Sequence, residues 1–219
     1  LCNVEAVREC VSKGKEAIDW LSDIGTSFTR DKSSNNYHLT QEGGHSKRRV
    51  VHSEDATGKE VSSSLAEIVR SISNIKVLEN HICVDLVTAK GRCVGAYVLD
   101  INTNEVKTFS SGSTIIATGG ASKIYLYTSN PDGSSGDGIG LAWRAGCKVE
   151  NLEFNQFHPT CLYHPEAKSF LLSEALRGEG AFLINNENER FMEKYDSRLE
   201  LAPRDLSLIH ISEPTRQAM

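Results

Sequence analysis

The sequence contains no apolar run that approaches the ~18 residues of a membrane-spanning helix, which argues against an integral membrane protein. It lacks a CxxC pair and the spacings typical of zinc ligands, so no metal site is expected. No secretory signal peptide is recognisable. Neither charge sign dominates, because 24 Lys and Arg stand against 29 Asp and Glu. The resulting net charge of −5, with mixed signs throughout, argues against nucleic acid or an anionic membrane as a partner.

What is present indicates an ordinary globular protein. The 219 residues, 39% of them hydrophobic, suffice for one large domain or two small ones with a real core. The six cysteines are Cys2, Cys10, Cys83, Cys93, Cys147 and Cys161. Because their spacing suggests no pairing, we expect buried thiols in a reducing compartment, with disulfides as the alternative.

The most informative stretch is residues 151–165, NLEFNQFHPTCLYHP, which crowds two histidines, Asn, Gln, Thr and Tyr among apolar side chains. An ordinary strand alternates polar and apolar residues, whereas here the polar residues cluster and a proline restrains the backbone after each histidine. This pattern favours the wall of a polar pocket. A surface loop with solvated histidines is the alternative, and these residues alone do not decide between the two.

Elsewhere the periodicity predicts ordinary helices and strands. Helical spacing predicts helices over residues 4–22, 57–72 and 139–145. Strands are predicted over residues 76–79, 82–89, 93–99, 106–109, 113–117 and 181–184. Turn residues at 102–104 predict a hairpin between the third and fourth of these strands, and the apolar run 113–117 is expected to be a buried strand.

Two glycine-rich segments follow each other in the middle of the chain. Residues 118–120, Thr-Gly-Gly, end the predicted strand 113–117, where bare backbone at a sheet edge can receive a cofactor. Residues 134–138, Ser-Ser-Gly-Asp-Gly, precede the helix 139–145, whose first N–H groups are free to face an anion or a polar ring edge. A simple turn and an ordinary N-cap explain each segment alone, but the two in series, followed by the polar stretch, favour a binding site.

Two further segments place charged groups beside residues that constrain the backbone. Residues 42–49, EGGHSKRR, combine charge with paired glycines that permit a close backbone approach, although a charged loop with nothing bound is the alternative. Pro203 precedes Arg204 and would hold its guanidinium in a defined place, unless it only marks a helix start.

Six motifs in a fixed order carry a resemblance to a known family. They are HLTQEGGHSKRR (38–49), IIATGGASKIY (115–125), SSGDGIGLAWRAGC (134–147), NLEFNQFHPTCLYHP (151–165), SEALRGEG (173–180) and LAPRD (201–205). Together they resemble the flavoprotein family of succinate dehydrogenase and fumarate reductase, and within it the L-aspartate oxidase branch. No single motif is specific, whereas six in family order are, and they cover nearly everything from about residue 4 to 205.

The resemblance implies an α/β fold, a doubly wound FAD-binding domain with an inserted smaller capping domain and the active site between them. The expected ranges are residues 1–157 for the FAD-binding domain and 158–205 for the start of the capping domain. The family's opening GxGxxG unit, which holds the FAD pyrophosphate, and its last third are missing, so both domains are expected to be incomplete. Residues 206–219 depart from the family pattern and are expected to be a non-native tail.

The resemblance also implies roles for residues that match the motifs. The residues expected to contact non-covalent FAD are Ile82, Cys83, Ala117, Thr118, Gly119 and Asp137. The residues expected to bind substrate are Glu42, Ser173, Glu174 and Arg177. The expected catalytic residues are His158, which binds a substrate carboxylate, and Arg204, which moves a proton to or from the substrate carbon. A dicarboxylate substrate is a dianion and the chain is net negative, so binding requires a local cluster of donors.

Glu42 bears on the choice between branches of the family. Succinate and fumarate lack an amino group, and the enzymes that handle them typically carry an uncharged residue at this place. A carboxylate there would pair with the ammonium of L-aspartate and select the amino acid. The alternative is a glutamate that forms an ion pair with Arg48 or Arg49.

The expected activity follows from the same resemblance. It is FAD-dependent oxidation of L-aspartate to iminoaspartate, with oxygen or fumarate as electron acceptor, as the first step of quinolinate and NAD biosynthesis in the cytoplasm. Quinolinate synthase is then a candidate partner. Two alternatives stay open: a succinate dehydrogenase or fumarate reductase flavoprotein subunit with an iron–sulfur partner, or a fragment that binds no flavin and is inactive by itself.

Overall fold

The structure is a computed structural model that describes residues 2–54, 56–156, 158, 161–162, 164, 166, 170–204 and 206. The chain divides into two compact units. The first unit comprises the described residues of 1–77 and 174–210, and the second those of 78–173. The predicted domain ranges 1–157 and 158–205 stay predictions. Of the expected tail, residues 206–219, all but residue 206 lie outside the described residues.

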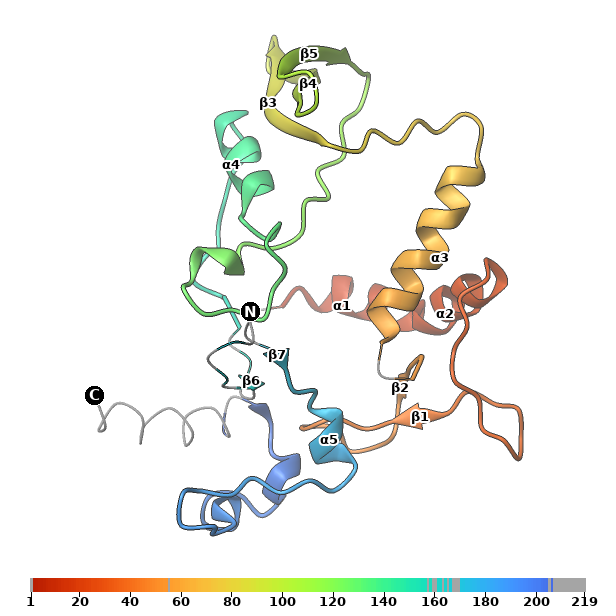
Figure 1. Ribbon diagram of the computed structural model, residues 1–219, viewed down its shortest axis with the longest axis vertical. Coiled ribbons are helices and arrows are strands. Elements are labelled where there is room, and N and C mark those ends of the chain that lie inside the picture. The colour runs from red at the N-terminus through yellow and green to blue at the C-terminus, as the bar shows by residue number, and fades with distance from the viewer. Residues whose placement is uncertain are drawn as a thin grey trace. The chain divides into compact units, whose positions relative to one another are not determined.

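Three helices dominate the N-terminal part of the first unit (Figure 1): α1 (Val4–Ser12), α2 (Gly14–Asp23) and α3 (Thr57–Ser71). The Asn3 side chain caps α1 by accepting a hydrogen bond from the Ala6 N–H at 3.1 Å. The single helix predicted over residues 4–22 is therefore wrong in one respect, because it is interrupted at Lys13. Gly14 follows directly and weakens helix continuity through its large backbone entropy. The prediction for residues 57–72 is confirmed by α3.

The rest of the first unit consists of short elements. Strands β1 (Leu39–Thr40) and β2 (Val50–Val51) pair antiparallel and close the loop 41–49 between them. Short helical turns follow late in the chain: α5 (Ala175–Gly178), η2 (Phe191–Lys194) and η3 (Leu199–Leu201). The strand predicted over residues 181–184 is wrong, because only an isolated bridge joins Ile184 to Arg190. Met192 and Ala202 are fully buried, and Arg190 donates to the buried Glu200 at 2.6 Å.

The second unit is built on an antiparallel three-stranded sheet in the order β3 (His81–Ala89), β4 (Arg92–Asp100) and β5 (Glu105–Ser110). The three corresponding predicted strands and the predicted hairpin are confirmed. Helix α4 (Asp137–Arg144) confirms the predicted helix near residues 139–145, and Arg144 joins it to β3 by an ion pair with Asp85 at 3.2 Å. The shorter elements are η1 (Ser122–Ile124), β6 (Cys161–Leu162) and β7 (Phe170–Leu171).

Two further predicted strands are not formed. Residues 76–79 and 113–117 have no ladder partner among the described residues, and Ile115 is 89% exposed rather than buried. A strand requires a neighbouring backbone for its N–H and C=O groups, so apolar β-branched residues alone do not produce one. All ladders in the described part of the chain are antiparallel, so these residues do not by themselves display the parallel sheet of a doubly wound domain.

The cysteines are free thiols, as expected, but they are not buried. Cys2, Cys10, Cys147 and Cys161 are exposed, while Cys83 and Cys93 are half-buried. The first two lie at or on α1, a helix on which no residue is buried. Among the described residues there is no helix both long and apolar enough to cross a membrane.

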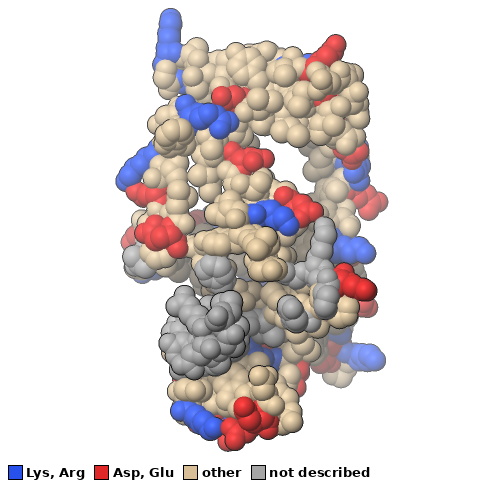
Figure 2. Space-filling view, turned by 60° about the vertical axis from the view of Figure 1, so that its left-hand side comes forward, with Lys and Arg blue, Asp and Glu red and all other residues tan. Residues whose placement is uncertain are grey.

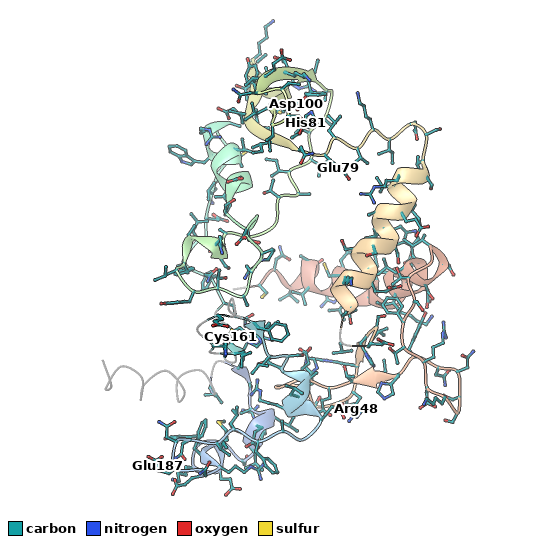
Figure 3. All side chains as sticks on the ribbon, in the orientation of Figure 1. Arg48, Glu79, His81, Asp100, Cys161 and Glu187 are labelled. Carbon is teal, nitrogen blue, oxygen red and sulfur yellow. The ribbon has the colours of Figure 1, made fainter. Side chains whose placement is uncertain are left out.

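An ion pair between Asp100 on β4 and Lys107 on β5 joins the two strands of the hairpin. Asp100 is paired with Glu105 in the β4–β5 ladder, and the Lys107 ammonium donates to the Asp100 carboxylate at 2.9 Å. His81 lies beside Asp100 (Figure 3). The Lys107 hydrogen bond lowers the pKa of Asp100 from 3.8 to about 2. Because the folded-state pKa lies below the unfolded value, the stabilisation is present above pH 3.8 and is lost as the pH falls toward about 2.

We therefore expect Asp100→Asn to flatten the acid side of the stability profile. Between pH 3.8 and about 2, where the stabilisation is lost, the wild-type unfolding midpoint should fall more steeply than that of the variant, as measured by thermal unfolding of the full-length protein. Lys107→Gln, which removes the donor, should flatten the profile in the same way. Parallel acid profiles for the wild type and Asp100→Asn would contradict this account.

Candidate functional site

In the second unit, the backbone at residues 116–120 lies against the start of α4. A Cβ at Gly138 would overlap the Thr118 hydroxyl and would come within 2.7 Å of the Ile116 side chain. The Gly136 N–H donates to the Gly120 carbonyl at 3.1 Å, and Gly136 caps α4 with a φ of 82°, which glycine adopts without strain. The two glycine segments singled out in the sequence therefore meet in space.

The predicted cofactor residues divide between this junction and the sheet. Ala117, Thr118 and Gly119 line a cavity of about 510 Å³ together with Gly138. Asp137 stands in the first turn of α4 and accepts a hydrogen bond from the Ser135 hydroxyl at 3.0 Å. A Cβ at Gly119 would meet nothing within 4 Å, so the backbone there is open to a ligand.

Ile82 and Cys83 lie on β3, the strand that contacts α4. Ile82 is 46% exposed, and burial raises the pKa of the Cys83 thiol. A raised pKa keeps this thiol protonated and unreactive, consistent with a packing role rather than nucleophilic chemistry.

His158 also belongs to the second unit. It lines a cavity of about 240 Å³ whose wall is otherwise made mostly of polar and aromatic residues: Ser122, Tyr125, Tyr127, Thr128, Ser129, Asn130, Asn155, Gln156 and Cys161. Ser122 donates to the Asn155 side chain at 2.9 Å, which fixes the amide at the start of the polar stretch. Four residues of the stretch therefore do line a polar pocket: Asn155, Gln156, His158 and Cys161. Ser173 is exposed near the end of this unit.

In the first unit, Glu174 is held between two arginines. Its side chain is only 2% exposed; one carboxylate oxygen accepts from Arg177 and the other accepts from Arg204 at 2.5 Å. The Arg177 guanidinium, itself 5% exposed, also donates to the Glu200 carbonyl at 3.0 Å. Removing one member of such a buried cluster would leave uncompensated charge, so its members hold one another in place.

The loop 41–49 packs against this cluster. A Cβ at Gly178, the end of α5, would overlap the Gln41 carbonyl, and one at Gly43 would lie 2.7 Å from the Arg177 guanidinium. The Gly44 N–H donates at 2.7 Å to the carbonyl of Leu201, which lies two residues before Pro203. The structure thus brings Glu42, Glu174, Arg177 and Arg204 together, all four of which the motifs had singled out.

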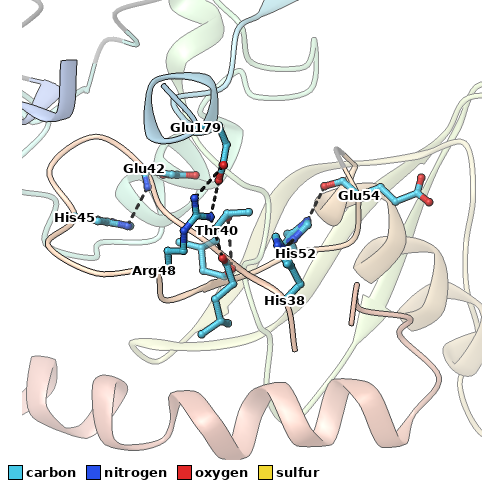
Figure 4. A network of polar contacts seen from close by, with 10 residues as sticks. His38, Thr40, Glu42, His45, Arg48, His52, Glu54 and Glu179 are labelled. Atoms are coloured by element: carbon cyan, nitrogen blue, oxygen red, sulfur yellow. Dashed lines mark hydrogen bonds and ion pairs between the residues drawn. The ribbon is translucent and has the colours of Figure 1, made fainter. Parts of the chain in front are cut away.

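The carboxylate of Glu42 is half-buried and has no hydrogen bond or ion pair to any residue that the structure describes. Its backbone N–H points to His45 Nδ1 at 3.4 Å, and the Gln41 side chain donates to the His45 carbonyl at 2.6 Å, so the loop forms a tight turn (Figure 4). The alternative in which Glu42 binds Arg48 or Arg49 is not what the described residues show. Arg48 is engaged elsewhere, and among these residues no ion pair joins Glu42 to Arg49.

Arg48 forms a two-pronged ion pair with Glu179, its guanidinium nitrogens donating to the two carboxylate oxygens at 2.6 and 3.0 Å (Figure 4). The Arg48 hydrogen bond lowers the pKa of Glu179. Sequence reasoning missed this pair, because the partners are separated by 131 residues and neither lies in a spacing that signals contact.

Sequence reasoning also missed the contact of His38 with His52, whose ring nitrogens Nδ1 and Nε2 lie 2.8 Å apart. A signal existed for this pair: once Leu39 is paired with Val51, the residues just outside the short hairpin must face each other. Charged groups elsewhere are mixed in sign, as the face in Figure 2 shows.

Comparison with known proteins places these features in a family. The model of a family described as FAD binding domain matches residues 1–215 of the chain. The chain belongs to this FAD-binding domain family. An L-aspartate oxidase from Pseudomonas aeruginosa is 56% identical over 94% of this chain and 40% of its own length. One from Vibrio cholerae is 53% identical over the same shares. The predicted resemblance is thereby confirmed.

A likeness in structure supports the fold class. The quinol fumarate reductase of E. coli matches with a TM-score of 0.90 over 100% of this chain and 38% of its own, at 24% identity. This confirms the predicted fold, although the described residues show only antiparallel ladders. The chain spans about two fifths of the length of the curated relatives that it matches.

The family membership confirms FAD as the predicted cofactor, and the second unit has features that fit it. No atom lies within 4 Å of a Cβ placed at Gly119, so a ligand can approach the backbone there. The missing side chain of Gly138 lets Thr118 pack directly against α4. The first turn of α4 also has backbone N–H groups beside the cavity. The flat ring and the polar chain of FAD both need backbone that no side chain covers, so the residues present are compatible with this cofactor.

Proposed function

We propose that the full-length protein is an L-aspartate oxidase that binds FAD non-covalently and converts L-aspartate to iminoaspartate. The observation that carries the proposal is the Glu42 carboxylate, which has no partner among the described residues and belongs to a loop that packs against a cluster with two arginines. The chain that carries it is 56% identical to a protein of that name. Carboxylate and guanidinium groups are the complements of an ammonium and of carboxylates, which L-aspartate carries together.

Each residue has a proposed task at this site. Glu42 binds the substrate ammonium, and Arg177 orients a substrate carboxylate. From their place in the family motifs, His158 and Ser173 are proposed to bind a substrate carboxylate. Glu174, whose two oxygens are already engaged by arginines, acts by positioning Arg204.

Arg204 is the proposed proton carrier. The role is carried over from the family motif LAPRD, in which Arg204 stands. The bond to Glu174 sets the direction of the guanidinium, and Pro203 restrains the backbone directly before it. When bound, FAD supplies the redox chemistry by accepting a hydride equivalent from the substrate.

The wider setting of the reaction is part of the proposal. Oxygen or fumarate would take up the electrons, and the iminoaspartate would enter quinolinate and NAD biosynthesis in the cytoplasm. Because an imine in water hydrolyses readily, a consuming enzyme such as quinolinate synthase is a proposed partner. A flavoprotein subunit that oxidises succinate is the competing function, and turnover of L-aspartate against succinate by the full-length protein separates the two.

Glu42→Gln provides the sharper test. The variant should oxidise L-aspartate with a kcat/KM lower by about 10-fold to 100-fold, because a charge-assisted hydrogen bond to the ammonium is lost. Fumarate has no ammonium, so fumarate reduction should be retained. Steady-state kinetics with both substrates would measure this, with Glu67→Gln on the exposed face of α3 as a matched control. Equal losses for both substrates would contradict the role of Glu42.

A further inference from the structure

The loop 41–49 carries one acidic side chain and several basic ones, yet its carboxylate has no partner among the described residues. Glu42 and Arg48 belong to the same loop, which β1 and β2 close at its ends. In a flexible loop these opposite charges would attract each other, and an ion pair with Arg48 or Arg49 was the alternative role for Glu42. The structure instead directs the Arg48 guanidinium to Glu179 (Figure 4).

In the Arg48–Glu179 pair both carboxylate oxygens are bonded to the guanidinium. Two N–H···O bonds of 2.6 and 3.0 Å join the guanidinium to both carboxylate oxygens, and the same guanidinium also donates to the Leu39 carbonyl at 3.3 Å. With the side chains 46% and 49% exposed, such a pair adds little to the free energy of folding. The pair has a larger effect on charge pairing than on folding. While Arg48 is bound to Glu179, it is not available as a partner for Glu42.

Glu179 is also well placed to do this. It follows Gly178, whose missing side chain leaves room for the Gln41 carbonyl, so the residue stands at the point where α5 touches the loop. The contact of Gly43 with Arg177 and the bond from Gly44 to Leu201 fix the other side of the loop. The Arg48 side chain therefore lies at the end of α5, whereas Glu42 lies in the turn with His45.

We propose that Glu179 is a specificity-determining positioning residue, which holds Arg48 in an ion pair and so keeps the Glu42 carboxylate free for the substrate ammonium. The inference rests on the proposed function, since it requires that Glu42 bind an amino-acid substrate. It predicts an asymmetry between the partners of the pair. Loss of Glu179 releases a competitor for Glu42, whereas loss of Arg48 does not.

The test is a double-mutant cycle in the full-length, FAD-loaded protein with Glu179→Gln, Arg48→Gln and the double variant. For L-aspartate, Glu179→Gln should raise KM by about tenfold with little change in kcat, because the freed Arg48 competes for Glu42. The defect should shrink at high salt, which screens the exposed competing pair. Adding Arg48→Gln should return KM to within about twofold of the wild type. The KM for fumarate should stay constant throughout.

The outcomes separate the inference from the function on which it rests. If the double variant is as impaired as Glu179→Gln, or if the KM for fumarate rises in parallel, the pair is only a structural clamp and the inference is overturned. If the wild-type protein binds and turns over succinate no less well than L-aspartate, the proposed function fails first and the inference fails with it. Flavin content and unfolding midpoints identify a variant that does not fold, and Glu179→Ala, which also removes the carboxylate, then replaces it with the same rise in KM expected.

Discussion

Replacing Arg204 by lysine in the full-length protein is expected to lower kcat for L-aspartate oxidation by about 10²–10⁴-fold, the usual contribution of a positioned proton-transfer group. Lysine keeps the positive charge but lacks the planar fork, and its ammonium cannot both reach Glu174 and occupy the place of the guanidinium. The KM should change less than kcat, because Arg177 and His158 are the proposed carboxylate ligands.

Stopped-flow reduction of the flavin by L-aspartate would measure the effect on the chemical step directly. Arg198→Lys is a matched control from the same segment, since Arg198 pairs with the neighbouring Asp196 at an exposed position. The control should keep nearly full activity. If Arg204→Lys reduced the flavin within about tenfold of the wild-type rate, with normal flavin content, Arg204 could not be the proton carrier.

Replacing Gly178 by alanine is the second substitution with a large expected effect. A methyl group there would overlap the Gln41 carbonyl, which is backbone and cannot rotate away. Either α5 or the loop 41–49 must then shift, at a cost of about 1–3 kcal/mol in unfolding free energy. Because Glu42 directly follows Gln41, the shift displaces the proposed ammonium ligand, and misplacement of about 1 Å can cost 10²-fold in rate.

Chemical denaturation and steady-state kinetics of the full-length protein measure both consequences. Gly58→Ala is the appropriate control, because a Cβ at Gly58 in the first turn of α3 would meet nothing within 4 Å. Alanine is the better helix former, so the control should be neutral or slightly stabilising. If Gly178→Ala were as stable and as active as Gly58→Ala, the loop would not be fixed by its contact with α5.

Local patterns predicted local structure well. The helical spacing of apolar residues in 57–72 and the turn residues at 102–104 specify α3 and the β4–β5 hairpin, since both depend on neighbours a few residues away. The same reasoning failed for residues 113–117, because an extended apolar run becomes a strand only beside a second strand. It also failed at Lys13, where the weak propensity of Gly14 outweighed the periodicity.

The sequence by itself determined the local elements, the glycines that permit close approach, and the family, because six motifs in order identify a chain without any coordinates. Only the tertiary structure decided which charges pair. Arg48 could have bound Glu42 within its own loop, yet it binds Glu179, 131 residues away. Coulomb attraction depends on distance and burial in space, and neither can be read from spacing along the chain.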